Sequence, residues 1–562
     1  MNKNKFIILT VFVLLLLTTI FYGRTLFTWF QQDEWDWMGR YTYYNSISHF
    51  PLWEAFKSSL FPHPRYRFTP LYDALYAGAT QIFGLEFIGY ALFGLFCHII
   101  NSILVYVLTQ KITRNHYIAF LSSILFATSS IGQKSVTWTA TSFNTEPAFT
   151  FSMLSIIAVV KYFTEKNRNI TQIFFYIFIA LWFKETALGV VLALPVIAFI
   201  LENKSHRIKT KKIFLATFVF LLIYFSTRYL LSRIGLRIHT EGYPDYGRLL
   251  SLGEYLKAGI WTPLRSFVDV FFFPNTLISI ATFFRGKHDI FAETVGVNYV
   301  TLIIFPLLSF FLFSVYKKFV PRKTAIKKVT LIGLTLVGVS IITYFLLTIR
   351  GSESIIYILR SRDLYISTAG ASILLAIPVY YLLTKTKKYY KFLGIFFLLI
   401  YLCYHYININ NFILTEEISR GTVRKPIIET IYLKYPQVGQ KSIFYIKSDT
   451  AYYGNSNPSL PYQTGFGRTL LVWYLIKNKS FTPALAKDDY LYPAFSEGYR
   501  EINGSGFGFF TNYEKLTQAV KDYSIPTENI YAFSYHGKNN LLEDVSIEVR
   551  KNLLESVKSR RK

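Results

Sequence analysis

Cysteine is scarce in this sequence. Only Cys97 and Cys403 occur among 562 residues, and both lie in apolar stretches. A disulfide framework is therefore not expected. The sequence also lacks an internal repeat and a low-complexity linker. No small-residue cleavage site follows the first apolar run at residues 21–24, so we expect this run to remain in the protein as a membrane span.

Acidic residues are also few: 33 Asp and Glu stand against 60 Lys and Arg, a net charge of +27. A basic excess of this size is compatible with nucleic-acid binding. However, the chain is 52% hydrophobic and 19% aromatic, which is typical of a polytopic membrane protein. Membrane proteins gather lysine and arginine in their cytoplasmic loops. We therefore interpret the charge as a topology signal and expect no nucleic-acid partner.

Apolar stretches of roughly 16–24 residues, long enough to cross a bilayer about 30 Å thick, recur through the first 410 residues. The stretches at 117–132 and 170–201 are short or closely joined, and 255–273 is amphipathic enough to lie along the membrane surface. Eleven spans are predicted, at 6–23, 86–109, 117–132, 148–163, 170–183, 187–201, 213–231, 299–316, 329–349, 364–384 and 392–409.

The basic residues of the connecting segments set the predicted orientation. The short loops 133–147 and 184–186 carry one lysine each, and the opposite side is richer in Lys and Arg. By the positive-inside rule, that richer side is cytoplasmic. We therefore expect an integral plasma-membrane protein with a cytoplasmic N-terminus and long outward loops at 24–85 and 232–298. The cytoplasmic segments are 1–5, 110–116, 161–169, 202–212, 317–328 and 385–391.

The C-terminal part of the sequence has a different pattern. It is less apolar, and after an odd number of spans it is expected outside the membrane. The segments 442–446 and 529–533 favour strands, whereas 470–477 and 512–523 favour helices. The predicted fold class is thus a polytopic α-helical membrane protein with a C-terminal extracytoplasmic α/β domain. The predicted domains are 1–409 and 410–562.

Three carboxylates, Asp33, Glu34 and Asp36, follow the first span by about ten residues. Charges at a membrane edge usually mark a functional site. A carboxylate there can act as a general base on a hydroxyl group, or it can bind a divalent cation. The structural alternative is an ordinary helix start, because Asp and Glu favour the first turn of a helix.

Two predicted outward segments place basic residues in constrained positions, one between prolines and one in a tight turn between spans. Arg65 and Arg67 lie with His63 between prolines in the first loop, an arrangement that suits a lipid phosphate or non-specific headgroup contacts. Lys184 and Glu185 form a tight turn between two spans, where charges are costly unless partnered. For this turn a purely structural ion pair is the alternative to a functional role.

A third basic element lies between the ninth and tenth spans. Arg350, Arg360 and Arg362 occupy an outward turn and so run against the positive-inside rule. An anion such as phosphate would account for them, and structural pairing with Glu353 or Asp363 is the alternative. Within the spans, His98 and Asn101 lie at i and i+3 on one helix face, a spacing that favours hydrogen bonds between helices over catalysis.

The order of these elements resembles the GT-C superfamily of integral-membrane glycosyltransferases, which use lipid-phosphate-linked sugars. The nearest likeness is to the transmembrane-and-tetratricopeptide O-mannosyltransferases and their bacterial relatives. The superfamily's acidic pair after the first span is matched by Asp33 and Glu34. The family's Tyr-Arg-Pro-Leu element is similar to 66–71 with two residues inserted, and its Ser-Lys-Glu-Thr turn is similar to 184–186. Further likenesses at 89–98 and 361–370 complete five motifs in the family's order, within residues 24–385.

The sequence departs from this family in the second outward loop. The family's His-Pro-x-His-x-Glu-Ala-Val element is replaced by residues 129–136, which lack both histidines and carry a lysine in the acidic place. Asn144 or Glu146, later in the same loop, is the candidate substitute. The C-terminal segment also lacks the 34-residue helical repeats of the animal proteins.

The resemblance implies inverting transfer of a sugar from a polyprenyl-phosphate donor to a hydroxyl group of a protein, glycan or lipid. Asp33 would be the general base, and Glu34 would hold the acceptor or a metal; a divalent cation is the open cofactor question. Glu185 and His98 are candidate supporting residues. The remaining expected partners are membrane lipids. The residues expected to bind the donor phosphate are Arg65, Arg67, Lys184, Arg350, Arg360 and Arg362.

Two other functions compete with transfer. A transporter or flippase of lipid-linked saccharides would need polar groups along a path through both leaflets. A non-catalytic membrane scaffold would instead use its outer domain to bind a partner. The scaffold predicts that Asp33, Lys184 and Arg362 lie far apart.

Overall fold

The structure, a computed structural model, describes residues 3–31, 33–61, 67–165, 169–202, 206–238, 251–287, 296–319, 324–349, 361–385, 387–452, 458–462, 465–478, 480–487, 491 and 497–559. Its contacts form two compact units. The first comprises Met1–Arg24, Ser58–Tyr72 and Ala91–Ile413. The second comprises Thr25–Lys57, Asp73–Tyr90 and Leu414–Lys562. A separate domain beginning at residue 410 stays a prediction.

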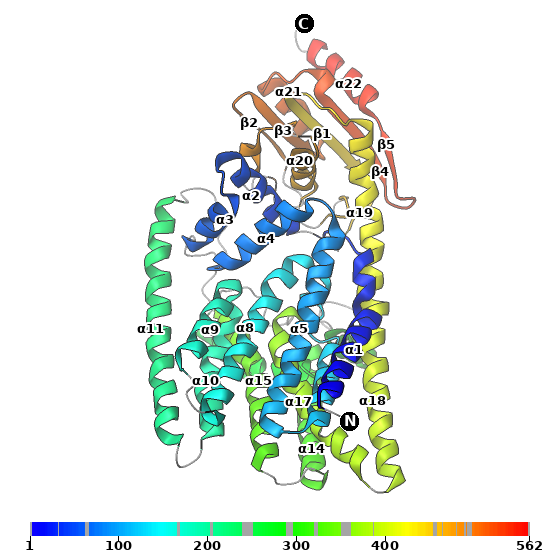
Figure 1. Cartoon of the computed structure of the whole chain (residues 1–562). Coiled ribbons are helices and arrows are strands. Elements are labelled where there is room, and N and C mark those ends of the chain that lie inside the picture. Colours follow the sequence, from blue (N-terminus) through cyan, green and yellow to red (C-terminus); the bar gives the residue numbers. More distant parts are fainter. Residues whose placement is uncertain are drawn as a thin grey trace. The chain divides into compact units, whose positions relative to one another are not determined.

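The first unit is built from long apolar helices. Figure 1 shows α5, α8, α15 and α17 running lengthwise in this unit. Helix α17 packs against α6, α15 and α18, and α8 packs against α9 and α10. The helices lying wholly or mostly in this unit are α1 (Lys3–Tyr22), α5 (Phe87–Thr113), α6 (His116–Ala127), α7 (Lys134–Thr137), α8 (Thr139–Thr164), α9 (Thr171–Phe183), α10 (Leu188–Leu201), α11 (Arg207–Ile238), α12 (Leu252–Asp269), α13 (Pro274–Arg285), α14 (Val297–Phe319), α15 (Thr324–Ile349), α17 (Tyr365–Thr384) and α18 (Lys388–Ile407).

Among the described residues, eight helical segments are long and apolar enough to cross a membrane. Three shorter apolar helices accompany them, at His116–Ala127, Thr171–Phe183 and Glu185–Leu201. Each of the eleven predicted spans coincides with one of these helices, and the short ones fall where the sequence is short or closely joined. The polytopic α-helical architecture is therefore confirmed, whereas the orientation and the surface position of 255–273 stay predictions.

One predicted loop is wrong. Residues 133–147 were expected as an outward loop, but α7 and the first turns of α8 occupy almost all of it. Polar side chains there bond to backbone carbonyls one turn back, as Ser142 Oγ does to Thr139 at 3.0 Å and Asn144 Nδ2 does to Ala140 at 3.2 Å. Because such bonds satisfy the polar groups locally, a polar sequence can form a buried helix.

The second unit contains a five-stranded sheet of order β2-β3-β1-β4-β5. Its central strand β1 (Lys441–Ser448) is parallel to β3 (Ser505–Phe510) and β4 (Ile530–His536), whereas β2 (Gly498–Ile502) and β5 (Leu541–Asp544) are antiparallel edges. Helices α21 (Tyr513–Asp522) and α22 (Ser546–Ser559) pack against Ile443 and Tyr445 of β1. The predicted α/β fold is confirmed, as are its strands 442–446 (β1) and 529–533 (β4) and its helices 470–477 (within α20, Phe466–Lys477) and 512–523 (α21). Helix α22 was not predicted.

Strand β3 was not predicted, because its sequence, SGFGFF, contains two glycines that strand propensity disfavours. The structure supplies their reason. A side chain at Gly506 would collide with the Tyr499 hydroxyl of the paired strand β2. Close packing across the strand pair, which sequence propensity does not register, therefore requires glycine there.

The long first loop is helical where the structure describes it. It contains α2 (Glu34–Ile47), α3 (Pro51–Leu60) and α4 (Pro70–Phe83). Helix α2 belongs to the same unit as the sheet, together with α19 (Thr415–Lys434) and α20 (Phe466–Lys477). The predicted acidic cluster is thus part of a unit that the C-terminal segment largely forms.

Candidate functional site

Lys184 lies in the turn where α9 ends. Its extended backbone (φ −157°, ψ 127°) terminates that helix. The ammonium Nζ lies 3.0 Å from Asp363 Oδ1 and donates a 2.7 Å hydrogen bond to Thr145 Oγ1. The side chains of Lys184 and Asp363 are only 12% and 6% exposed, so this ion pair is largely removed from water.

Charges converge on this lysine. Burial lowers the pKa of Lys184 to about 8, from an ordinary value of 10.5, and Asp363 opposes that shift. The positive charges of Arg362 and Arg67 lower the pKa further. Three of the residues predicted to bind phosphate thus influence one another electrostatically within the first unit. A group of cations this close favours an anionic ligand, which would relieve their mutual repulsion.

Glu185, the next residue, joins two other segments to the turn. Its Oε1 lies 2.7 Å from Arg228 Nη1 on α11 and accepts a 2.9 Å hydrogen bond from the Phe68 backbone N–H. The Lys184–Glu185 pair offered as a structural alternative is therefore resolved into two separate ion pairs, Lys184–Asp363 and Glu185–Arg228. Whether Glu185 also supports catalysis, as the sequence predicts, stays a prediction.

We expect Glu185→Ala to lower the free energy of unfolding by about 1–3 kcal/mol, because it removes a carboxylate that binds a guanidinium and a backbone N–H. Glu185→Gln should cost less, since its amide oxygen can still accept from the Phe68 N–H. Thermal unfolding of the purified protein in detergent measures both. Equal stability of the alanine variant and the unchanged protein would contradict this role.

Arg362 also contacts the helices of the first unit. It lies in the short helix η5 (Ser361–Leu364), with its guanidinium carbon 5.1 Å from the centroid of the Trp138 ring. Its carbonyl accepts a 3.1 Å hydrogen bond from Ser135 Oγ. Arg67 is exposed. Three other predicted phosphate-binding residues, Arg65, Arg350 and Arg360, lie outside the described residues.

A polar network lies between the apolar helices. His98 Nδ1 is 2.7 Å from the Tyr365 hydroxyl, and His98 Nε2 is 3.1 Å from the Ala127 carbonyl. Asn101 Oδ1 accepts a 2.6 Å hydrogen bond from Thr150, and its Nδ2 donates to the Tyr365 hydroxyl at 3.4 Å. The predicted interhelical hydrogen bonds of His98 and Asn101 are therefore confirmed.

Asn144 and Glu146 lie in α8 rather than in an outward loop, which corrects their predicted position. Glu146 is fully buried, and its Oε1 accepts a 3.3 Å hydrogen bond from Tyr365. Asn144 accepts a 2.7 Å hydrogen bond from the Thr145 hydroxyl, the group that also receives the Lys184 ammonium. Asn144 is thus linked to the cationic group through Thr145, whereas Glu146 belongs to the buried network. Their functional roles stay predictions.

In the second unit, the acidic pair lies at the beginning of α2. Asp33 is half-buried, and its carbonyl accepts the Asp36 N–H at 3.1 Å while its carboxylate makes no capping hydrogen bond. Glu34 is fully buried, and its Oε2 accepts the Gln31 N–H at 3.2 Å. The helix-start alternative therefore holds for the position of Asp33 but gives its carboxylate no capping role.

Across the described residues, no three His, Cys, Asp or Glu side chains are grouped to hold a metal ion. Asp33 and Glu34 would thus supply at most two ligands. A divalent cation such as Mg²⁺ is often bound by one or two carboxylates together with substrate phosphates and water. The cofactor question stays open on this donor set.

Several residues of this region were not singled out from the sequence. Thr145, Trp138 and Arg228 contact residues of the cationic group or of the neighbouring turn, although nothing in the sequence around them marks a site. Asp363, given from the sequence as an alternative partner of the arginines in this turn, pairs with Lys184. The signal that could have found it is the position of a lone acid where an apolar span begins.

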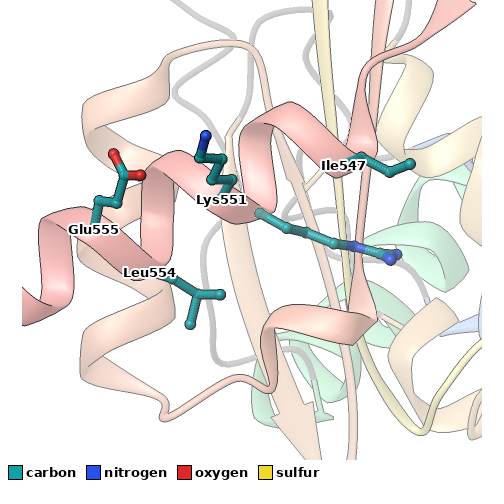
Figure 2. Close-up of a pocket in the computed structure, with 5 residues that line it drawn as sticks. Ile547, Lys551, Leu554 and Glu555 are labelled. Carbon is teal, nitrogen blue, oxygen red and sulfur yellow. The ribbon is translucent and has the colours of Figure 1, made fainter.

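A surface hollow is present elsewhere, beside α22 (Figure 2). A single helix supplies its lining, and none of the predicted site residues contributes. The hollow is therefore not a candidate for the predicted chemistry. Its lining residues are Ile547, Arg550, Lys551, Leu554 and Glu555.

One family model matches part of the chain. Residues 63–230 match the family model described as dolichyl-phosphate-mannose-protein mannosyltransferase. This range includes Arg67, Lys184 and Glu185. A search of curated proteins found no match.

Two solved structures are similar in fold to the chain. One is ArnT from Cupriavidus metallidurans bound to undecaprenyl phosphate, at 10% identity and TM-score 0.45, covering 95% of this chain and 94% of that one. The other is ArnT from the same organism in the apo state, at 10% identity and TM-score 0.43, covering 95% and 93%.

Proposed function

We propose that the chain is a GT-C membrane glycosyltransferase that uses a polyprenyl-phosphate sugar. The proposal is supported by the match of residues 63–230 to the dolichyl-phosphate-mannose-protein mannosyltransferase family model and by the motifs that the sequence shares with the GT-C superfamily. The protein moves one sugar from a polyprenyl-phosphate carrier to a hydroxyl acceptor at the outer face of the plasma membrane. The acceptor is a protein, a glycan or a lipid.

The observation that carries this proposal is the cationic group around Lys184. Burial and the charges of Arg362 and Arg67 lower the pKa of Lys184 despite its ion pair with Asp363, so a bound anion would stabilise the charged lysine further. The phosphate of a lipid-linked sugar is such an anion, and it gains charge as its bond to the sugar breaks. Cations already in place stabilise that developing charge without further rearrangement.

The proposed step is a single displacement. Asp33 takes the proton of the acceptor hydroxyl while the hydroxyl oxygen forms a bond to the anomeric carbon of the sugar. The bond from that carbon to the phosphate oxygen breaks, its electron pair stays with the phosphate, and the configuration inverts. Lys184, Arg362 and Arg67 neutralise the departing polyprenyl phosphate, with Arg65, Arg350 and Arg360 as further members of the predicted set. Glu34 holds the acceptor or a metal.

The test uses membranes containing the overproduced protein, incubated with a panel of radiolabelled polyprenyl-phosphate sugars. The expected result is loss of label from one lipid and its appearance on a hydroxyl-bearing product. Label that crosses the bilayer while still attached to its lipid would support the flippase instead. Label that is neither consumed nor moved, for every sugar in the panel, would favour a scaffold and overturn the proposal.

The transfer assay also tests for a cofactor, and protease treatment tests the orientation. Activity measured after chelation, with Mg²⁺ or Mn²⁺ added back, decides whether a divalent cation takes part. Protease treatment of sealed right-side-out vesicles is expected to cleave the C-terminal segment and to spare the N-terminus. The opposite cleavage pattern would reverse the proposed orientation.

A further inference from the structure

Helix α20 carries one charged residue in its apolar interior. Arg468 is 1% exposed, although the surrounding sequence of α20 is rich in leucine and aromatic residues. A buried guanidinium is stable only when it is paired and hydrogen-bonded. Its Nη2 lies 3.3 Å from Asp36 Oδ1 and donates a 2.8 Å hydrogen bond to the Ala486 carbonyl. Arg468 therefore binds α2 from within the C-terminal segment.

Asp36 is held from two directions. Its second carboxylate oxygen, Oδ2, lies 3.0 Å from Arg40 Nε, one turn further along α2. Asp36 is itself 6% exposed, so neither of its oxygens is mainly solvated. The pair Asp36–Arg468 thus fixes one face of α2 against α20, three residues after Asp33.

Aromatic packing reinforces the same contact. Trp35 is 1% exposed, with its ring centroid 5.5 Å from that of Trp29 and 6.3 Å from that of Trp473 on α20. On another side of α2, Trp37 Nε1 donates a 3.0 Å hydrogen bond to Asp73 Oδ1. Residues 35 and 36 therefore contact α20, whereas Trp37 contacts Asp73 of α4, and contacts with two helices restrict rotation of α2 about its axis.

Gly39 shows how closely α2 and α20 approach. A Cβ atom at this position would lie 3.0 Å from Arg468 Nη2 and 3.0 Å from Val472 Cγ2. Contacts of that length are tighter than ordinary van der Waals packing, so a side chain there would require the Arg468 guanidinium or Val472 to shift. The glycine thus leaves room for the arginine beside Asp36 at this crossing.

We propose that Arg468 is a positioning residue that fixes α2, and with it the Asp33–Glu34 pair, in the orientation required for sugar transfer. The inference rests on the proposed function. It assigns to the C-terminal segment a direct part in organising the reaction, through a contact made to Asp36 rather than to substrate. Removing it should therefore lower turnover and leave the affinity for the lipid donor unchanged.

The test compares Arg468→Met with Arg420→Met in the full-length purified protein. Arg420 is a matched control, because it is a 45% exposed arginine of α19 paired with Glu416. Hydrogen exchange of the α2 amides is expected to accelerate in Arg468→Met only, while β1 and β4 stay protected. The kcat should fall about 10²-fold, the loss typical of a displacement near 1 Å, with the KM for donor unchanged. Arg468→Lys should recover part of the kcat.

A second variant covers the case in which Arg468→Met fails to fold, seen as faster exchange in β1 and β4 as well. Gly39→Ala removes no charge but places a methyl group 3.0 Å from the Arg468 guanidinium and from Val472. It should therefore disturb the contact of Arg468 with Asp36, raise α2 exchange and lower kcat with donor KM unchanged. Unchanged α2 exchange, or unchanged kcat despite faster exchange, overturns the proposal. If the unsubstituted protein consumes no polyprenyl-phosphate sugar, the proposed function fails, and the exchange measurement alone decides whether Arg468 fixes α2.

Discussion

Replacing Asp33 with asparagine is expected to lower kcat by about 10²–10⁴-fold, the usual contribution of a general base. The substitution keeps the size of the side chain and removes only its ability to accept the acceptor's proton. Because asparagine fills the same space as aspartate, we expect a smaller effect on stability than on kcat. An acid in the first turn of a helix contributes only about 0.3–1 kcal/mol through the helix dipole. Turnover and thermal stability should therefore separate clearly in this variant.

The matched control is Glu54→Gln, which removes a first-turn carboxylate from the neighbouring helix α3. It should leave transfer unchanged. Donor binding, measured by retention of a labelled polyprenyl-phosphate sugar, should also be unchanged in Asp33→Asn, since a base acts after the donor is bound. Full transferase activity in Asp33→Asn would remove Asp33 from the mechanism, and lost donor binding would make it a binding residue instead.

The membrane-spanning helices were predictable because a span requires a long apolar run, and each of the eleven predicted runs coincides with a helix. The beginning of α8 was not, since hydropathy counts a polar side chain as exposed whether or not a neighbour satisfies it. Asn144 and Ser142 are buried because they bond to carbonyls of their own helix. Strand β3 was not predicted because strand propensity disfavours its glycines, whereas the folded strand needs them to make room for Tyr499.

The sequence predicted which charged residues belong to the site better than it predicted which of them form ion pairs. A lysine in a tight turn between apolar spans indicates a buried cation from local sequence alone. Nothing local indicates that its partner is Asp363, or that Asp36 is paired with Arg468, because each pair joins residues far apart in the chain. Local charge is encoded in neighbouring residues, whereas ion-pair identity is decided by how distant helices pack.

Replacing Lys184 with methionine is expected to lower kcat/KM by about 10²–10³-fold at pH 7, comparable to removing one oxyanion-stabilising donor. In the unsubstituted protein, the pKa of about 8 predicts that the Lys184 ammonium loses its proton between pH 7 and pH 9. The KM for the lipid donor should therefore rise across that range, while the neighbouring arginines stay charged. Lys184→Met should lose this pH dependence, and Lys184→Arg should keep donor affinity but also lose the dependence.

The control for this prediction is Lys111→Met, because Lys111 pairs with Glu165 at 3.1 Å but is 29% exposed. It should leave both the activity and its pH profile unchanged. A Lys184→Met variant that still shows the rise in donor KM would assign the titration to another group, and one with full activity would remove Lys184 from the donor site.

The pH dependence of the free energy of unfolding gives an independent test of the same lysine. Its folded pKa lies below the unfolded value of about 10.5, so between pH 8 and 10.5 the unfolded chain binds more protons than the folded one. The free energy of unfolding of the donor-free protein should therefore gain a contribution from Lys184 as the pH rises through this window, while donor affinity falls. A general loss of structure at high pH would lower both quantities together. Opposite changes, both absent in Lys184→Met, are thus specific to a buried lysine that is stabilised in its charged form by a bound phosphate.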